Sequence, residues 1–422
     1  MERYESYKDS GVAWMGQVPS HWIHSRIKFC LSRSVAGIWG DDEKGNKDDI
    51  VCFRVADFDY SKGCLTFDKL TIRNVSAAQL QNRLLHDEDL LIEKSGGGDA
   101  TPVGRVVRFN YNDKAICSNF IHSISVKEGY SSNYLYYYFY GMYANKVNLL
   151  YFNQTTGIQN LKVGEYLSQT IYLPTLVEQQ AIAAYLDKRC CEIDKAIATQ
   201  QKRIALLQEL KQSIITHAVT RGIHPDVPLK ESGVEWIGKV PEHWDIKRMR
   251  FLCTIDTGTR DTIDKVDDGD YPFYVRSPKI ERINTYTFDG EAVLMAGDGV
   301  GAGKVIHYAN GKFDYHQRVY NIHNYKEIAT LFAYYYLQSN FRYKIEEGGA
   351  KNTVDSVRLP WLKDFPVCIP PQREQDEILT FIKKNNARIN TLILKAERQI
   401  ELLQELRQSV ITEAITGKIK VC

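Results

Sequence analysis

A glycine-rich segment is the first place where this sequence could hold a phosphate group. Residues 297–305 read GDGVGAGKV. A nucleotide-binding phosphate loop follows the pattern G-x-x-x-x-G-K-[ST], with glycines for close backbone approach and a hydroxyl for magnesium. Asp298 stands at the first glycine of that pattern and Val305 at the hydroxyl. No helical pattern follows to support a dinucleotide fingerprint either, so we expect no nucleotide site here.

Other residue types that perform catalysis do not occur in suitable groups. An adenine methyltransferase needs a loop of the type N/D-P-P-Y/F around the flipped base, whereas the prolines at 370–371 lie between Ile369 and Gln372. The paired carboxylates at 41–42 and 267–268 lie among Gly, Lys and Asn, as is typical of solvated loops. The histidines show no metal-ligand spacing. We therefore expect neither a catalytic residue nor a metal site in this chain.

Local charge suggests contact with nucleic acid. Residues 94–127 hold five basic and two acidic side chains. Arg and Lys hold phosphates, and Asn, Gln, Arg and His can also pair with base edges. The DNA-binding candidates are Lys94, Arg105, Arg108, Asn119 and His122 in the first half, and Lys304, His316, Gln317 and Arg318 in the second. The alternative is that these side chains are simply solvated.

Each group of candidates is next to a glycine-rich turn, at residues 95–98 and 297–303. Apolar runs precede and follow each turn, which predicts two strands joined by a hairpin or flexible loop. The turn either approaches a phosphate backbone or is a plain surface turn.

Composition fits an ordinary globular chain. Hydrophobic residues make up 44%, charged residues 25%, and the formal net charge is +2. No apolar run approaches the roughly 20 residues of a membrane span, and the N-terminus lacks the apolar region of a signal peptide, so we expect a cytoplasmic protein without membrane contact. The nine cysteines include no C-x-x-C pair and are expected to be reduced core residues.

A long internal repeat organises the chain. The segment KDSGVAWMGQVPSHW at 8–22 returns as KESGVEWIGKVPEHW at 230–244, with ten of fifteen positions identical. A second pair, RIALLQELKQSIITHAVT from Arg203 and RQIELLQELRQSVITEAI from Arg398, follows each half. This length of repeat indicates two domains rather than a stacked array. The stretches between the repeats, Ile23 to Tyr172 and Asp245 to Cys368, are unlike each other, and we call them the first and second lobes.

The repeated segments at 178–220 and 374–416 predict two long helices, because they contain no internal Gly or Pro. Apolar residues recur at steps of three and four, as in a coiled-coil seam. The seam residues are Ile197, Ile204, Leu207 and Ile214 in one helix and Ile393, Ile400, Leu403 and Val410 in the other. A twofold relation between the halves would make the helices antiparallel. The alternative is a helical hairpin used only for packing. The tyrosine-rich runs at 134–143 and 334–343 have helical spacing and favour core packing over base stacking.

These repeats make the whole chain resemble the DNA-specificity subunit of Type I restriction-modification systems. The tags, the phrase LPTLVEQQAIAAYLD with its echo around Glu374–Gln375, and the paired LLQEL helices carry the resemblance. It implies two α/β (α+β) target-recognition domains joined by two long antiparallel helices. It also implies a bipartite asymmetric site on double-stranded DNA, two methyltransferase subunits as partners, and restriction subunits. S-adenosylmethionine, ATP and magnesium would then belong to those partners, and this chain would bind no cofactor.

The resulting domain ranges are an N-terminal tag (1–22), the first target-recognition domain (23–172), the first spacer helix region (173–222), a second tag (223–244), the second target-recognition domain (245–368) and the second helix region (369–422). Two other classes remain open. One is a stand-alone DNA-binding regulator, and the other is an enzyme with an unfamiliar site.

Overall fold

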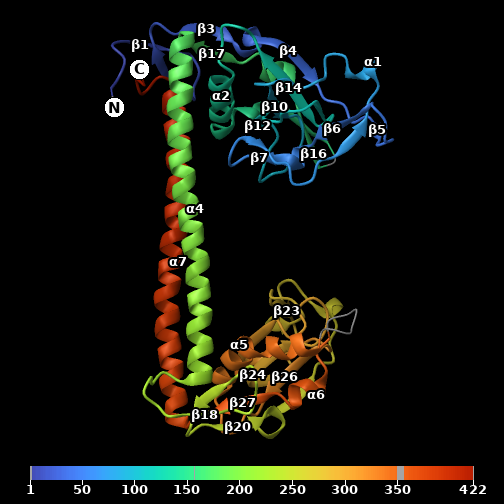
Figure 1. Ribbon diagram of the computed structural model, residues 1–422, viewed down its shortest axis with the longest axis vertical. Coiled ribbons are helices and arrows are strands. Elements are labelled where there is room, and N and C mark those ends of the chain that lie inside the picture. Colours follow the sequence, from blue (N-terminus) through green and yellow to red (C-terminus); the bar gives the residue numbers. More distant parts are fainter. Residues whose placement is uncertain (1, 156, 349–355, 422) are drawn as a thin grey trace. The chain divides into compact units, whose positions relative to one another are not determined.

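The computed structural model describes residues 2–155, 157–348 and 356–421. The chain forms two compact units: unit 1 combines residues 1–199 with residues 399–422, and unit 2 is the continuous segment 200–398 (Figure 1). The boundary between the units divides both long helices, and the six domain ranges given above remain predictions.

Unit 1 contains the first lobe and its tag. Its strands are β1 (Tyr7–Asp9), β2 (Gln17–Pro19), β3 (Ile23–Arg26), β4 (Leu31–Ala36), β5 (Asp41–Asp42), β6 (Asp49–Phe53), β7 (Phe58–Asp59), β8 (Cys64–Leu65), β9 (Ile72–Asn74), β10 (Leu90–Glu93), β11 (Ser95–Gly96), β12 (Val106–Arg108), β13 (Ala115–Cys117), β14 (Ile121–Val126), β15 (Phe152–Thr155), β16 (Ile158–Leu161) and β17 (Thr170–Leu173). Its short helices are α1 (Ala77–Leu80), α2 (Ser132–Ala144) and α3 (Val163–Tyr166), with 3-10 turns η1 (Ile27–Cys30), η2 (Val55–Asp57) and η3 (Val147–Leu150).

Unit 2 contains the second lobe and its tag. Its strands are β18 (Leu229–Glu231), β19 (Lys239–Pro241), β20 (Asp245–Arg248), β21 (Thr254–Thr257), β22 (Tyr271–Tyr274), β23 (Glu281–Ile283), β24 (Phe288–Ala296), β25 (Ile306–Tyr315), β26 (Val319–His323) and β27 (Pro366–Ile369). Its helices are α5 (Thr330–Gly348) and α6 (Leu359–Lys363), with 3-10 turns η4 (Met249–Phe251) and η5 (Thr262–Asp264).

The two lobes share one strand order although their sequences are unlike. The order β12-β10-β14-β4 in unit 1 corresponds to β25-β24-β26-β21 in unit 2. Each lobe also has one parallel strand pair. In unit 1, β6 pairs with β13, which precedes β14; in unit 2, β22 pairs with the end of β25, which precedes β26. The predicted hairpins around the two glycine turns are confirmed as the antiparallel pairs β10–β12 and β24–β25.

The central strand of each sheet is buried on both faces, which explains its continuous apolar sequence. In β10, Leu90 and Ile92 pack with the tyrosines of α2, whereas Leu91 faces a second cluster around Phe53. In β24, Val293 and Met295 pack with α5 in the same way. The tyrosine-rich runs are thus core helices, as predicted.

The long helices are α4 (Leu176–Arg221) and α7 (Gln372–Ile415), close to the predicted ranges. They pack antiparallel. In unit 1, Arg407 of α7 meets Asp194 of α4 at 3.2 Å, and in unit 2, Lys211 of α4 meets Asn390 of α7 at 3.0 Å. The predicted seam residues are half-buried, apart from the fully buried Val410.

The cysteine prediction holds only in part. Five of the described cysteines are buried, but Cys64 and Cys253 are intermediate and Cys191 is exposed, so the expectation of a core residue is wrong for Cys191. Adjacent helix positions point about 100° apart, so Cys190 faces the core and Cys191 cannot. Cys422 lies outside the described residues. No helix in the described ranges is long and apolar enough to cross a membrane.

Candidate nucleic-acid interface

Both arginines predicted to bind DNA in unit 1 are engaged in contacts within that unit. Arg105 bonds Glu93 through Nε at 2.9 Å, and its guanidinium lies 3.5 Å from the ring centre of Tyr60. Glu93 is buried, so this ion pair neutralises a carboxylate that would otherwise be costly to hold there. The structure therefore places Arg105 in the frame of the lobe rather than on an open face.

Arg108 joins the lobe to the long helix. At the end of β12, its Nη2 group meets Asp187 of α4 at 3.0 Å, and its Nη1 group donates to Asn133 of α2 at 3.1 Å. The guanidinium also stacks over Tyr136. These contacts tie a strand, α2 and α4 together.

The remaining candidates of unit 1 lie at one edge of the sheet. Asn119 is exposed on the turn between β13 and β14. The backbone N–H of Lys94 donates to the carbonyl of Phe120 in that turn at 2.8 Å. His122 follows on β14 and shares a 2.8 Å hydrogen bond with Ser34. Burial, and then the charge of Lys94, lower the pKa of His122 to about 4. This histidine is neutral near pH 7 and cannot act there as a cation toward phosphate.

In unit 2, three consecutive candidates form the turn between β25 and β26. His316 is buried, and its Nδ1 accepts a hydrogen bond from the backbone N–H of Arg318 at 3.0 Å. Gln317 is exposed, and its amide donates to Asp261 at 2.6 Å. The fourth candidate, Lys304, is exposed on the loop between β24 and β25. The buried His316 side chain therefore stabilises the backbone of this turn.

Arg318 belongs to a charged cluster that the sequence did not reveal. Its Nη1 group lies 2.5 Å from one oxygen of Asp298, and Nη1 of Arg276 lies 3.0 Å from the other oxygen. Burial alone would raise the pKa of Asp298, but the hydrogen bonds from the two arginines outweigh it and lower this pKa. The aspartate that breaks the phosphate-loop pattern thus holds two arginines, which no local sequence pattern signals.

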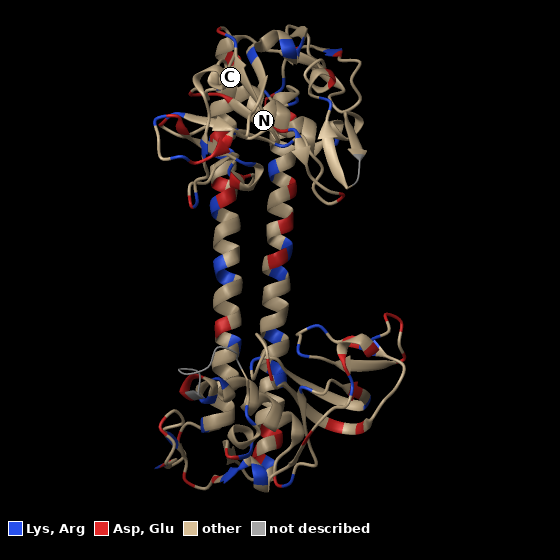
Figure 2. Ribbon diagram, turned by 90° about the vertical axis from the view of Figure 1, so that its right-hand side faces the viewer, with Lys and Arg blue, Asp and Glu red and all other residues tan. Residues whose placement is uncertain are grey.

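Basic and acidic residues are interspersed along the ribbon of both units, as Figure 2 shows. Within the described ranges, no group of three His, Cys, Asp or Glu side chains is placed to hold a metal ion.

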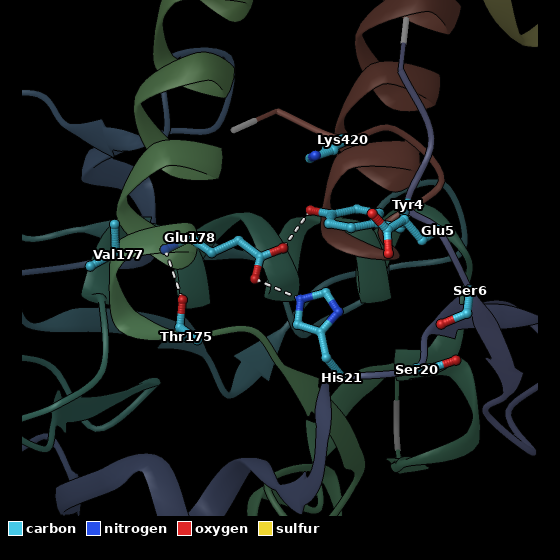
Figure 3. Close-up of a pocket in the computed structure, with 9 residues that line it drawn as sticks. All are labelled: Tyr4, Glu5, Ser6, Ser20, His21, Thr175, Val177, Glu178 and Lys420. Carbon is cyan, nitrogen blue, oxygen red and sulfur yellow. Dashed lines mark hydrogen bonds and ion pairs between the residues drawn. The ribbon is translucent and has the colours of Figure 1, made fainter.

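The repeated tags are fastened to the long helices by buried glutamates. Glu178, in the first turn of α4, accepts hydrogen bonds from the Trp22 indole at 3.1 Å and from the hydroxyl of Tyr4 at 2.5 Å, and it pairs with His21 at 3.1 Å. Figure 3 shows Glu178, Tyr4 and His21 around a pocket, which the side chain of Lys420 also lines.

The same junction recurs in unit 2. Glu374, in the first turn of α7, pairs with His243 at 2.7 Å and accepts from the Trp244 indole at 3.1 Å. The glutamine that follows each glutamate, Gln179 or Gln375, accepts from a backbone N–H close to the start of α2 or α5. Sequence reasoning noted both repeats but missed their contact. The repeated Glu-Gln pair was the available signal.

Comparison with protein families finds the domain described as "Type I restriction modification DNA specificity domain" twice, over residues 46–209 and 241–402. Together these matches cover more than half of the chain.

Three curated proteins illustrate the relationship. The specificity subunit of the Type I restriction enzyme EcoDI from Escherichia coli is 32% identical over 182 residues, which are 43% of this chain and 40% of that protein. The MjaVIII specificity subunit from Methanocaldococcus jannaschii is 23% identical over 68% of this chain and 70% of its own. The putative MjaX specificity subunit of the same organism is 25% identical over 60% of this chain and 59% of its own. The chain thus spans only about two fifths of the EcoDI subunit in alignment.

Solved structures show the same fold. A chain from a structure of the type I R-M system superposes with a TM-score of 0.70 at 15% identity, covering 95% of this chain and 99% of that one. The HsdS subunit from Thermoanaerobacter tengcongensis gives a TM-score of 0.50 at 14% identity, covering 95% and 98%.

Proposed function

Because the chain belongs to the family defined by the Type I restriction modification DNA specificity domain, we propose that it is the non-catalytic subunit that reads DNA sequence for a restriction-modification complex. Each of the two lobes reads one half of a bipartite, asymmetric site on double-stranded DNA. The observation that carries this proposal is the double match of the specificity domain, once per half of the chain.

Two features of the fold support division of the site between the lobes. The strand order around the central hairpins is the same in both lobes, so both can present the same surface to DNA. The exposed side chains on that surface differ, as with Asn119 and Gln317. A common frame with different side chains suits two unlike half-sites.

The partners that we propose are two methyltransferase subunits and the restriction subunits of the system. The recurrence of the tag–helix junction at Glu178 and Glu374 supports two equivalent partner positions. The partner subunits would bind S-adenosylmethionine, ATP and magnesium, and this chain would bind none of these three cofactors. The complex would work in the cytoplasm, where the DNA is.

Reconstitution tests this function. The purified chain should transfer no methyl group to DNA from S-adenosylmethionine, whereas the chain mixed with its modification subunit should methylate one split motif, read by methylome sequencing. The modification subunit alone is the control and should be inactive. Methyl transfer by the isolated chain, or methylation by the complex without a split motif, would contradict the proposal.

A stand-alone DNA-binding regulator is the second candidate class. It is not favoured, because the family match covers both halves and the relatives are named as subunits of restriction enzymes. A regulator would bind its site and change transcription in a host that lacks the partner subunits.

A further inference from the structure

The turn between β13 and β14 in unit 1 and the turn between β25 and β26 in unit 2 occupy the same place in their lobes. The Lys94 N–H donates to the Phe120 carbonyl at 2.8 Å, and the Gly297 N–H donates to the Arg318 carbonyl at the same distance. On the other side of each turn, the N–H of Ser118 or His316 donates to the end of the parallel strand, β6 or β22, at 2.9 or 3.0 Å. Arg318 therefore stands where unit 1 has Phe120.

The backbone at this place is held tightly in both lobes. An added Cβ on Gly37 would lie 2.2 Å from the carbonyl oxygen of Ser118, and one on Gly258 would lie 2.0 Å from the carbonyl oxygen of Tyr315. Only glycine allows this close approach. The backbone of the turn is thus closely packed in both lobes, whereas the exposed side chains on the turn differ between the lobes.

In unit 2 this turn carries Arg318, and Arg276, which follows β22, meets the same carboxylate; both arginines are oriented and accessible. The side chain of Arg318 is 60% exposed and that of Arg276 is 40% exposed, whereas their shared carboxylate, Asp298, is only 17% exposed. Each arginine meets Asp298 through Nη1, so Nε and Nη2 lie outside this contact. Asp261 also interacts electrostatically with Arg318, so the cluster offers directed hydrogen-bond donors rather than a large net positive charge.

The loop from Gly297 to Val305 packs closely against the same cluster. A Cβ on Gly301 would lie 2.7 Å from the backbone oxygen of Arg276. The preceding residue, Val300, is 93% exposed. The loop therefore fixes the backbone of Arg276 and leaves its side chain at the surface.

We propose that Arg318 and Arg276, oriented by Asp298, read a guanine in the half-site recognised by unit 2. This inference deepens the proposed function and rests on it. A guanidinium can donate two parallel hydrogen bonds to O6 and N7 of guanine in the major groove, which is the commonest specific contact to a base. Asp298 is a positioning residue, because it limits each guanidinium to one orientation before DNA arrives.

The test uses the complex of the full chain with its modification subunit and compares wild type with Arg318→Ala and Arg276→Ala by methylome sequencing. At least one arginine variant should lose discrimination at one G·C pair of one half-site by roughly 5- to 150-fold. The other half-site and the gap between the halves should not change. Lys326→Ala is the matched control, since Lys326 is an exposed cation beyond the far end of β26, and it should leave the motif intact.

Asp298→Asn separates base reading from simple attraction to phosphate. If Asp298 positions the arginines, this variant should lose preference at the same G·C pair while binding non-specific DNA at least as tightly, because it removes a negative charge. If the arginines only contact phosphates, Asp298→Asn would bind every sequence more tightly with an unchanged motif, and the arginine variants would lose affinity uniformly with a smaller salt dependence. That second pattern would overturn the inference.

The outcomes also separate this inference from the proposed function. A wild-type complex that methylates no split motif would refute the proposed function itself. A wild-type complex that methylates a split motif, together with folded arginine variants that keep the motif unchanged, would refute only the role of the arginines. Thermal unfolding of each variant shows whether it is folded.

Discussion

At the scale of single residues, Glu178 and Glu374 show how a buried carboxylate can fasten a repeated tag. Replacing Glu374 by alanine should lower the free energy of unfolding by about 1–3 kcal/mol, because the buried Trp244 N–H loses its acceptor. Urea denaturation followed by tryptophan fluorescence measures the change. Glu397→Ala, at an exposed position of the same helix, is the control and should change stability little. Equal losses in the two variants would contradict a fastening role for Glu374.

His122 makes stability depend on pH. Burial lowers its pKa from 6.5 to about 4 in the folded chain, so the unfolded chain binds the proton at a higher pH. Its contribution to stability is complete above about pH 6.5 and is lost as the pH falls toward 4. His122→Asn should therefore reduce the loss of stability between pH 7.5 and pH 5.

Urea unfolding of wild type and His122→Asn at the two pH values measures this effect. The values at pH 7.5 are the internal control, because the histidine is neutral there in both folded and unfolded chains and only packing differs. An identical loss of stability in both proteins on acidification would argue against the buried neutral histidine.

At the scale of elements, polar pairs hold the two long helices in register. The repeat relates Arg407 to Lys211 and Asp194 to Asn390, so the contacts Arg407–Asp194 and Lys211–Asn390 are two copies of one contact. A polar pair among apolar seam positions disfavours shifted alignments, in which one partner would be buried alone.

A double-mutant cycle on Asp194 and Arg407 tests this role. Asp194→Leu leaves the largely buried Arg407 without its partner and should destabilise the protein, and adding Arg407→Leu should recover much of that loss. We expect a coupling energy of roughly 1–2 kcal/mol, reduced by the partial exposure of Asp194. The surface pair Arg189–Glu192 on α4 is the control, with an expected coupling below about 0.5 kcal/mol. A coupling no larger than that of the control would remove the argument for a register contact.

At the scale of the whole molecule, each half-site should follow its lobe. Exchanging residues 23–172 for the first lobe of a related specificity subunit should change one half of the methylated motif and leave the other half and the gap unchanged. The reason is that the tags and helices are shared while only the lobes differ. Methylome sequencing of a host with the exchanged chain and its modification subunit reads the result. A change in both halves would count against independent readers.

The long helices should set the gap. Inserting one heptad between Gln200 and Lys211, and one at the matching place in α7, lengthens each helix by roughly 10 Å, or about three base pairs of DNA, and preserves the seam. The gap in the motif should change while both half-sites stay the same. An insertion of three residues is the matched control, because it breaks the heptad register and should impair recognition. A heptad variant that keeps the original gap would show that the helices are not the spacer.

The sequence by itself determined the features that depend on local pattern. Helical spacing of apolar residues was sufficient for α4, α7 and the tyrosine-rich α2 and α5, and apolar runs around glycine turns were sufficient for the hairpins. The tandem repeat revealed two halves, because identical segments at a fixed offset need no structure to be recognised. The choice of DNA-binding side chains remains a prediction.

Tertiary structure alone decided which charged groups meet. Arg105 and Arg108 share one basic stretch of sequence, yet Arg105 pairs with Glu93 of its own sheet and Arg108 with Asp187 of a long helix. Arg276 and Arg318 converge on Asp298 from separate strands and loops. Ion pairs form between side chains that lie close in space, whatever their separation in the sequence. The partner of a charged side chain therefore depends on the folded backbone. No periodicity in the sequence records it.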